Sequence, residues 1–70
     1  MAKISLDNGH TYITAREAMP EIAANNLWDT IANLMDDDTR EAVHSEIAPC
    51  TEVEFLAAYL DRATGDLIVG

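Results

Sequence analysis

Three helix-start signals divide this chain into short helices. At each one a Thr or Asp is followed three residues later by a Glu, in Thr14–Glu17, Asp38–Glu41 and Thr51–Glu54. This spacing is typical of a capping box, in which both side chains bond free backbone amides of the first helical turn. An apolar stripe of helical period follows each signal. The sequence therefore predicts one helix from about residue 15, one that ends near residue 47, and one over residues 52–63.

Three single positions bear on where the helices begin and end, and one of them predicts a fourth helix. Asn26 is expected to cap a helix of its own, with Asp29 at the third helical position. Pro20 is awkward inside the first helix, so either the first turn is short and irregular or Pro20 falls near a helix start. Gly65 suits the C-terminal cap of the last helix.

Short alternating segments at the two ends of the chain predict strands. Residues 3–6 and 10–13 flank Asn8-Gly9, a strong turn signal, so residues 3–14 are expected to form a β-hairpin. Leu67–Val69 is expected to pair with this hairpin and complete a small antiparallel sheet. The predicted fold class is α+β, in the order ββααααβ. Seventy residues cannot build two cores, so we expect a single acidic domain over residues 1–70.

Negative charge gathers in the second half of the chain. Thirteen Asp and Glu oppose four Lys and Arg, which gives a net charge of −9. Residues 36–70 hold nine of these acids against only Arg40 and Arg62. A surface of this sign repels nucleic acids and anionic membranes, so direct binding to either is not expected. The lone Cys50 cannot form an internal disulfide, which fits a reducing cytoplasm.

The residues that usually signal catalysis or cofactor binding are missing from the sequence. Its three glycines form no phosphate-binding loop. In the EF-hand register from Asp36, Glu41 stands where Gly is required and Ile47 where Glu is required. No catalytic residue, metal site or cofactor is therefore expected. Cys50 is expected to be a half-buried structural residue, and a cysteine-dependent enzyme is kept as an alternative.

The acidic residues of the second half are the candidates for partner binding. If the apolar stripes point inward, these carboxylates point outward or lie at helix ends, and two acidic helices could imitate a run of DNA phosphates. Arg40 and Arg62 are expected to hold local carboxylates, and Trp28, Phe55 and Tyr59 to belong to the core. The candidate partner-binding residues are Asp36, Asp37, Asp38, Glu41, Glu46, Glu52, Glu54 and Asp61.

The chain also resembles a known class of proteins over nearly its full length. It is similar to small acidic proteins of phages and mobile elements, and among these to anti-CRISPR proteins that inhibit type I-C systems. The segments that carry the resemblance are Leu27–Asp29, Met35–Asp38, Arg40–His44, Ala48–Thr51, Glu54–Leu56 and Gly65–Gly70. The resemblance implies an inhibitor that acts in the cytoplasm of a bacterial host and binds the host surveillance complex (Cascade) as a DNA mimic. It assigns no binding residue.

The prediction is thus a non-catalytic inhibitor of a basic, DNA-handling complex, acting as a monomer or weak dimer. An antitoxin or adaptor that masks a partner through an apolar groove is the alternative. Acids clustered on the surface favour the first, and an exposed apolar patch favours the second.

Overall fold

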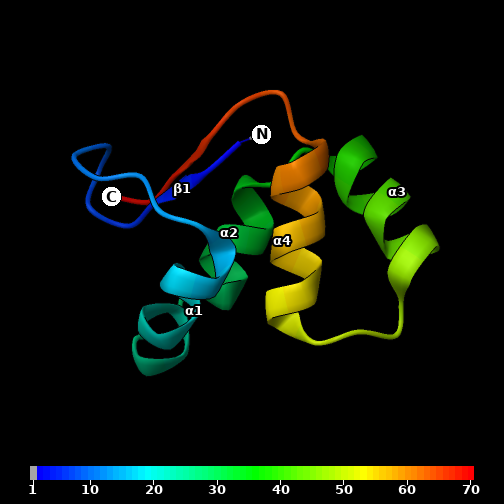
Figure 1. Ribbon diagram of the computed structural model, residues 1–70, viewed down its shortest axis with the longest axis horizontal. Helices are drawn as coiled ribbons and strands as arrows, with labels where there is room; N and C mark the ends of the chain where they lie inside the picture. Colours follow the sequence, from blue (N-terminus) through cyan, green and yellow to red (C-terminus); the bar gives the residue numbers. More distant parts are fainter. Residues whose placement is uncertain (1) are drawn as a thin grey trace.

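Four helices and two short strands make up the part of the chain, residues 2–70, that the computed structural model describes (Figure 1). α4 lies between α1 and α3 and contacts both. The expected combination of four helices with terminal strands is therefore confirmed. In chain order the elements are β1 (Ile4–Ser5), α1 (Ala15–Ala24), α2 (Trp28–Leu34), α3 (Asp37–Ile47), α4 (Glu52–Arg62) and β2 (Leu67–Ile68).

Two of the three predicted capping boxes are confirmed. At the start of α1, Thr14 Oγ1 accepts from the Glu17 amide at 3.3 Å, and Glu17 Oε1 accepts from the Thr14 amide at 3.2 Å. Thr51 and Glu54 repeat this exchange at the start of α4. The backbone hydrogen bond from Thr14, followed by that of its hydroxyl, lowers the pKa of Glu17 because both favour the charged carboxylate.

The other two predicted helix starts are wrong in detail. The N-cap of α3 is Asp36 and not Asp38, because the Asp36 carboxylate accepts from both the amide and the hydroxyl of Thr39 at 3.0 Å. Asn26 does not cap α2 but turns the chain, with a left-handed φ of 53°. Leu27 stands at the N-cap of α2 without a side-chain bond. α2 therefore depends on packing rather than on a cap.

The expectations for Pro20 and Gly65 are also wrong. α1 runs through Pro20, which lies in the helix interior and is exposed, so neither of the expected irregularities occurs. α4 ends at Arg62 because Ala63 is extended, with φ −70° and ψ 149°. Gly65 therefore lies beyond the cap position.

The predicted N-terminal hairpin does not form. Ile4 makes a single antiparallel bridge with Ile13, and no longer ladder joins the two segments within residues 2–70. β1 pairs instead with β2, with Ile4 opposite Leu67 and Ser5 opposite Ile68, and the two strands are parallel. The small sheet is therefore parallel and not antiparallel, and it joins the two ends of the described chain.

Hydrogen bonds within the loop after β1 explain why the hairpin is lost. Asn8 and Gly9 form the expected turn, with φ of 59° and 90°. Ser5 Oγ accepts from the Gly9 amide, and Asp7 Oδ1 accepts from the Thr11 amide, each at 2.8 Å. These bonds curl the loop away from β1, and the same backbone hydrogen bond from Thr11 lowers the pKa of Asp7. Ile13 bonds both backbone groups of Ile4 on one edge of β1, and β2 pairs along the opposite edge.

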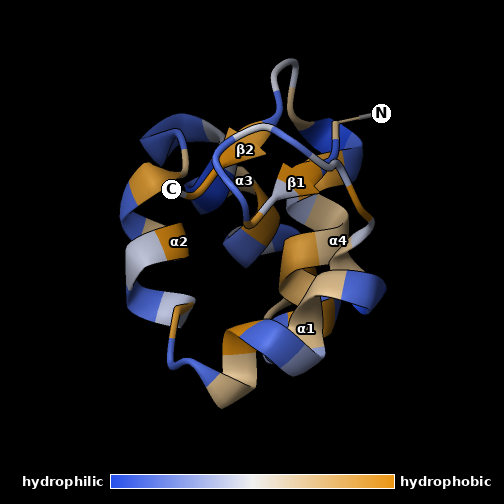
Figure 2. Cartoon of the chain, turned by 90° about the vertical axis from the view of Figure 1, so that its left-hand side faces the viewer, coloured by the Kyte–Doolittle hydropathy of each residue, from blue (hydrophilic) through white to orange (hydrophobic). Residues whose placement is uncertain are grey.

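The hydrophobic core lies where the strands meet the inner faces of the helices. Figure 2 shows the hydrophobic strands side by side at one end of the helices. α4 contributes Leu56, Tyr59 and Leu60, which are all buried. No helix in residues 2–70 is long and apolar enough to cross a membrane. The other buried apolar residues are Ala2, Ile4, Ala15, Ala18, Ile22, Ile31, Met35, Val43, Leu67 and Val69.

Candidate partner-binding surface

The eight candidate acids are all exposed on α3, on α4 and at the starts of these helices. Their positions follow from the apolar stripes, since Val43 of α3 and Leu56 of α4 are buried and point these helices inward. The acids differ, however, in what else they contact. Some of them support the fold, and the carboxylates of the others are left to solvent.

Two of the eight acids take part in helix capping. Asp36 caps α3, and Glu54 completes the capping box of α4 with Thr51. Loss of an N-cap side chain costs about 0.5–2 kcal/mol of stability. Substitution of either residue would therefore change the fold as well as the charge.

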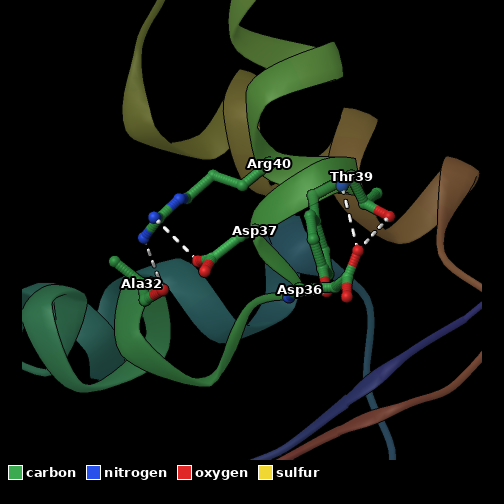
Figure 3. Close-up of polar contacts among 6 residues, drawn as sticks. Ala32, Asp36, Asp37, Thr39 and Arg40 are labelled. Atoms are coloured by element: carbon green, nitrogen blue, oxygen red, sulfur yellow. Dashed lines mark hydrogen bonds and ion pairs between the residues drawn. The ribbon is translucent and has the colours of Figure 1, made fainter.

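Two further acids are held by the arginines of the acidic half, as predicted. Arg40 Nη2 lies 3.0 Å from Asp37 Oδ1, and Arg62 Nη1 lies 2.6 Å from Glu46 Oε1. Arg40 also donates from Nη1 to the carbonyl of Ala32, at 3.1 Å, in the last turn of α2 (Figure 3). The second pair joins α3 to α4. Both arginines are thus engaged within the chain.

The side chains of the remaining four acids make no hydrogen bond or ion pair with any other residue in the described part of the chain. Asp38 and Glu41 lie one turn apart on α3, on the side away from Val43. Glu52 is the first residue of α4, and Asp61 lies near its end. These carboxylates are fully available to a partner.

The eight acids do not all share one face. Asp61 borders a hollow of about 530 Å³ between α1 and α4, together with Lys3 and Arg16, the two cations of the first half. α1 and α3 lie on different sides of α4 (Figure 1). Asp61 therefore belongs to a mixed surface, whereas Asp37, which pairs with Arg40, and the unpaired Asp38 and Glu41 lie on the outer face of α3, here called the α3 acidic face.

A buried tyrosine fixes the start of this face. The amide of Asp36 donates to Tyr59 Oη at 2.8 Å, and Tyr59 is buried in α4. The first turn of α3 is thus tied to α4 by Tyr59 and to α2 by Arg40. The sequence placed Tyr59 in the core but carried no signal for this bond, because the two residues are 23 positions apart.

Tyr59→Phe should lower the free energy of unfolding by about 0.5–1.5 kcal/mol, because the Asp36 amide loses its acceptor. Urea denaturation measures the change. Tyr12→Phe is the matched control, since Tyr12 is 41% exposed. Equal effects of the two substitutions would show that the hydroxyl of Tyr59 contributes nothing.

Two of the three aromatic residues expected in the core lie at its edge. Trp28 and Phe55 are half-buried and meet edge to face, with ring centroids 6.2 Å apart and planes at 85°. Cys50 is exposed, so its expected half-buried position is wrong. Within residues 2–70 the Cys50 thiol makes no hydrogen bond to either histidine. No group of three or more His, Cys, Asp or Glu that could hold a metal is found among these residues.

Comparison with models of known protein families matches residues 22–62 to the anti-CRISPR protein AcrIC5, a type I-C inhibitor. The match covers more than half of the chain. The chain belongs to this family. No curated protein and no solved structure matches it. Membership in the AcrIC5 family confirms the resemblance seen in the sequence and implies inhibition of a CRISPR system.

The segment shared with the AcrIC5 family contains the whole candidate surface. It runs from Ile22, near the end of α1, to Arg62, the last residue of α4. Both strands lie outside it, and all eight candidate acids lie inside it. The family match therefore concerns the helices that carry the charge.

Proposed function

We propose that this protein inhibits a type I-C CRISPR system without catalysis, by binding the DNA-handling surveillance complex where the complex would bind DNA. The observation that carries the proposal is the α3 acidic face. The carboxylates of Asp38 and Glu41 have no partner among the described residues, whereas the nearby Asp37 carboxylate is paired with Arg40. A protein surface that binds DNA is basic, so it attracts such a face.

The spacing of these carboxylates suits a groove that holds phosphates. Residues three or four apart on a helix are separated by about 4.5–6 Å along its axis. Phosphates along one strand of DNA are separated by about 3.4 Å of axis. The α3 acidic face thus offers a short row of negative charges at a spacing of the same order. Lysines and arginines that contact phosphates can reach such a row without a specific fit.

The uneven charge also favours one orientation of the bound protein. Lys3 and Arg16 lie around the hollow between α1 and α4, and α3 lies beyond α4. A basic groove attracts the α3 side more strongly than the mixed surface around Lys3 and Arg16. Charge asymmetry of this kind speeds association and orients the encounter.

Competition with DNA tests the proposal. Purified type I-C surveillance complex, incubated with the protein before its target duplex is added, should lose duplex binding as the protein approaches stoichiometric amounts. The affinity of the protein for the complex should fall steeply between about 50 mM and about 500 mM salt, because the contact is electrostatic. If duplex and protein bind the complex together, DNA mimicry is wrong. An affinity indifferent to salt would instead support masking through an apolar groove.

A further inference from the structure

An aromatic hollow lies beside the α3 acidic face. It has a volume of about 370 Å³ and opens between α2, α3 and the segment that leads into α4. Trp28, Met35 and Phe55 provide apolar lining, and Arg40, Cys50 and Glu52 also border it. We call it the Trp28 hollow. Its aromatic side chains are half-buried, so they present ring surface to whatever enters.

The ring pair at this hollow is suited to contact a cation. Trp28 and Phe55 meet edge to face at 6.2 Å, an arrangement that holds both rings in place. The face of a tryptophan ring is the best aromatic partner for a positive charge. Tryptophan is also among the residues that most often dominate the binding energy at interfaces.

The charges around the hollow are complementary to a cation as well. Glu52 has no ion pair within residues 2–70, and Glu41 borders an adjoining hollow that shares Arg40, His44 and Phe55 with the first. Arg40 is held by Asp37 and by the carbonyl of Ala32, so its charge is already balanced. His44 is the other titratable group that lines both hollows. The uncompensated charge at the rim is therefore negative.

We propose that the Trp28 hollow receives an arginine side chain of the partner protein. The guanidinium group would lie against the ring of Trp28 and pair with the carboxylate of Glu52. Arginine fits better than lysine, because its planar, weakly hydrated head group stacks on aromatic rings while it bonds a carboxylate. This inference rests on the proposed function, since a groove that binds phosphates supplies such arginines. It adds a second, partly apolar contact to the α3 acidic face.

Salt dependence separates this contact from the acidic face. Trp28→Leu should weaken binding to purified type I-C surveillance complex by about tenfold at both about 50 mM and about 500 mM salt, because stacking survives screening. Glu52→Gln should weaken it about threefold to tenfold at the lower salt and little at the higher. Leu34→Ala is the control, because Leu34 is an exposed apolar residue of the same helix that does not line this hollow. Binding of a folded Trp28→Leu variant as tight as that of the unchanged protein would overturn the proposal.

A crosslinking experiment gives a second test that leaves Trp28 in place. Cys50 is the one cysteine of the chain, is exposed and borders the hollow. A benzophenone maleimide on Cys50 should crosslink to a subunit of the surveillance complex, and excess unlabelled protein should prevent it. Two further variants carry the benzophenone elsewhere, each in a Cys50→Ser background. Ser45→Cys tests whether the complex contacts α3, and Ala24→Cys tests whether it contacts the end of α1.

The pattern of crosslinks distinguishes the two proposals. Crosslinks from Cys50 and from Ser45→Cys, with none from Ala24→Cys, support both. A crosslink from Ser45→Cys without one from Cys50 overturns the proposed arginine contact at the Trp28 hollow. It leaves the proposed role of the α3 acidic face unaffected. A crosslink from Ala24→Cys alone overturns the proposed function and this inference together.

Discussion

Reversal of Asp38 and Glu41 to lysine should lower the affinity for the type I-C surveillance complex by about 100-fold at about 50 mM salt, with a matching loss of CRISPR inhibition. Both residues lie on the α3 acidic face and are exposed, and their side chains bond no other described residue. Each reversal removes an attraction and adds a repulsion at the proposed interface. The effect should shrink at about 500 mM salt, where exposed charges are screened.

The chain offers a closely matched control for this variant. Glu21→Lys with Asp29→Lys changes the net charge by the same amount, from −9 to −5, because each reversal adds two charges. Asp29 lies in the first turn of α2, as Asp38 does in α3, so the helix-dipole cost of about 0.3–1 kcal/mol is similar in both variants. Glu21 and Glu41 are both exposed helical residues.

Binding of both double variants to the immobilised complex tests whether the position of the charge matters. Circular dichroism checks that both variants fold. The control pair should change the affinity by less than about threefold, because only the overall field is altered. Equal losses for the two pairs would mean that net charge matters and the α3 acidic face does not. No loss for either pair would remove the electrostatic proposal entirely.

Helix starts could be predicted from the sequence because they depend on residues three positions apart. Thr14 with Glu17, and Thr51 with Glu54, bond as their spacing indicates. The start of α3 was predicted two residues late, because Asp36, Asp37 and Asp38 are equally good caps in isolation. The Tyr59 hydroxyl on the Asp36 amide ties the chain to α4 at Asp36, and that contact is tertiary.

Strand pairing could not be predicted in the same way. Asn8 and Gly9 do form a turn, but Ser5 and Asp7 take up the loop amides that a hairpin would have used. The partner of Ile4 is Leu67, more than 60 positions away. A strand of two residues carries too little pattern to indicate which segment it joins.

The sequence was enough to predict that the candidate acids are exposed. It was not enough to predict how they and their neighbours are arranged in space. Apolar stripes were enough to place the acids outward. They could not show that Asp61 lies with Lys3 and Arg16, nor that Trp28 and Phe55 stay half-exposed beside Glu52. Both facts depend on how α4 packs against its neighbours, which is a property of the whole chain.

Leu56→Ala should lower the free energy of unfolding by about 2–5 kcal/mol, because Leu56 is fully buried in the helix that contacts both α1 and α3. A domain of this length has roughly 0.05–0.15 kcal/mol of stability per residue, or about 3.5–10 kcal/mol in total. The substitution should therefore remove a large part of the stability. Urea denaturation measures the shift in midpoint.

Two companion variants decide what Leu56 contributes. Leu56→Met conserves most of the side-chain volume and should cost less than about 1.5 kcal/mol. Leu34→Ala removes the same atoms from a side chain that is 48% exposed, so it should cost far less than Leu56→Ala. If Leu56→Ala and Leu34→Ala unfold at the same urea concentration, α4 is not the centre of the core.

Because α4 also holds the start of α3 through Tyr59, partial unfolding of Leu56→Ala should reduce CRISPR inhibition even though every acidic residue is retained. Inhibition that returns in Leu56→Met would show that the α3 acidic face acts only when the core positions it.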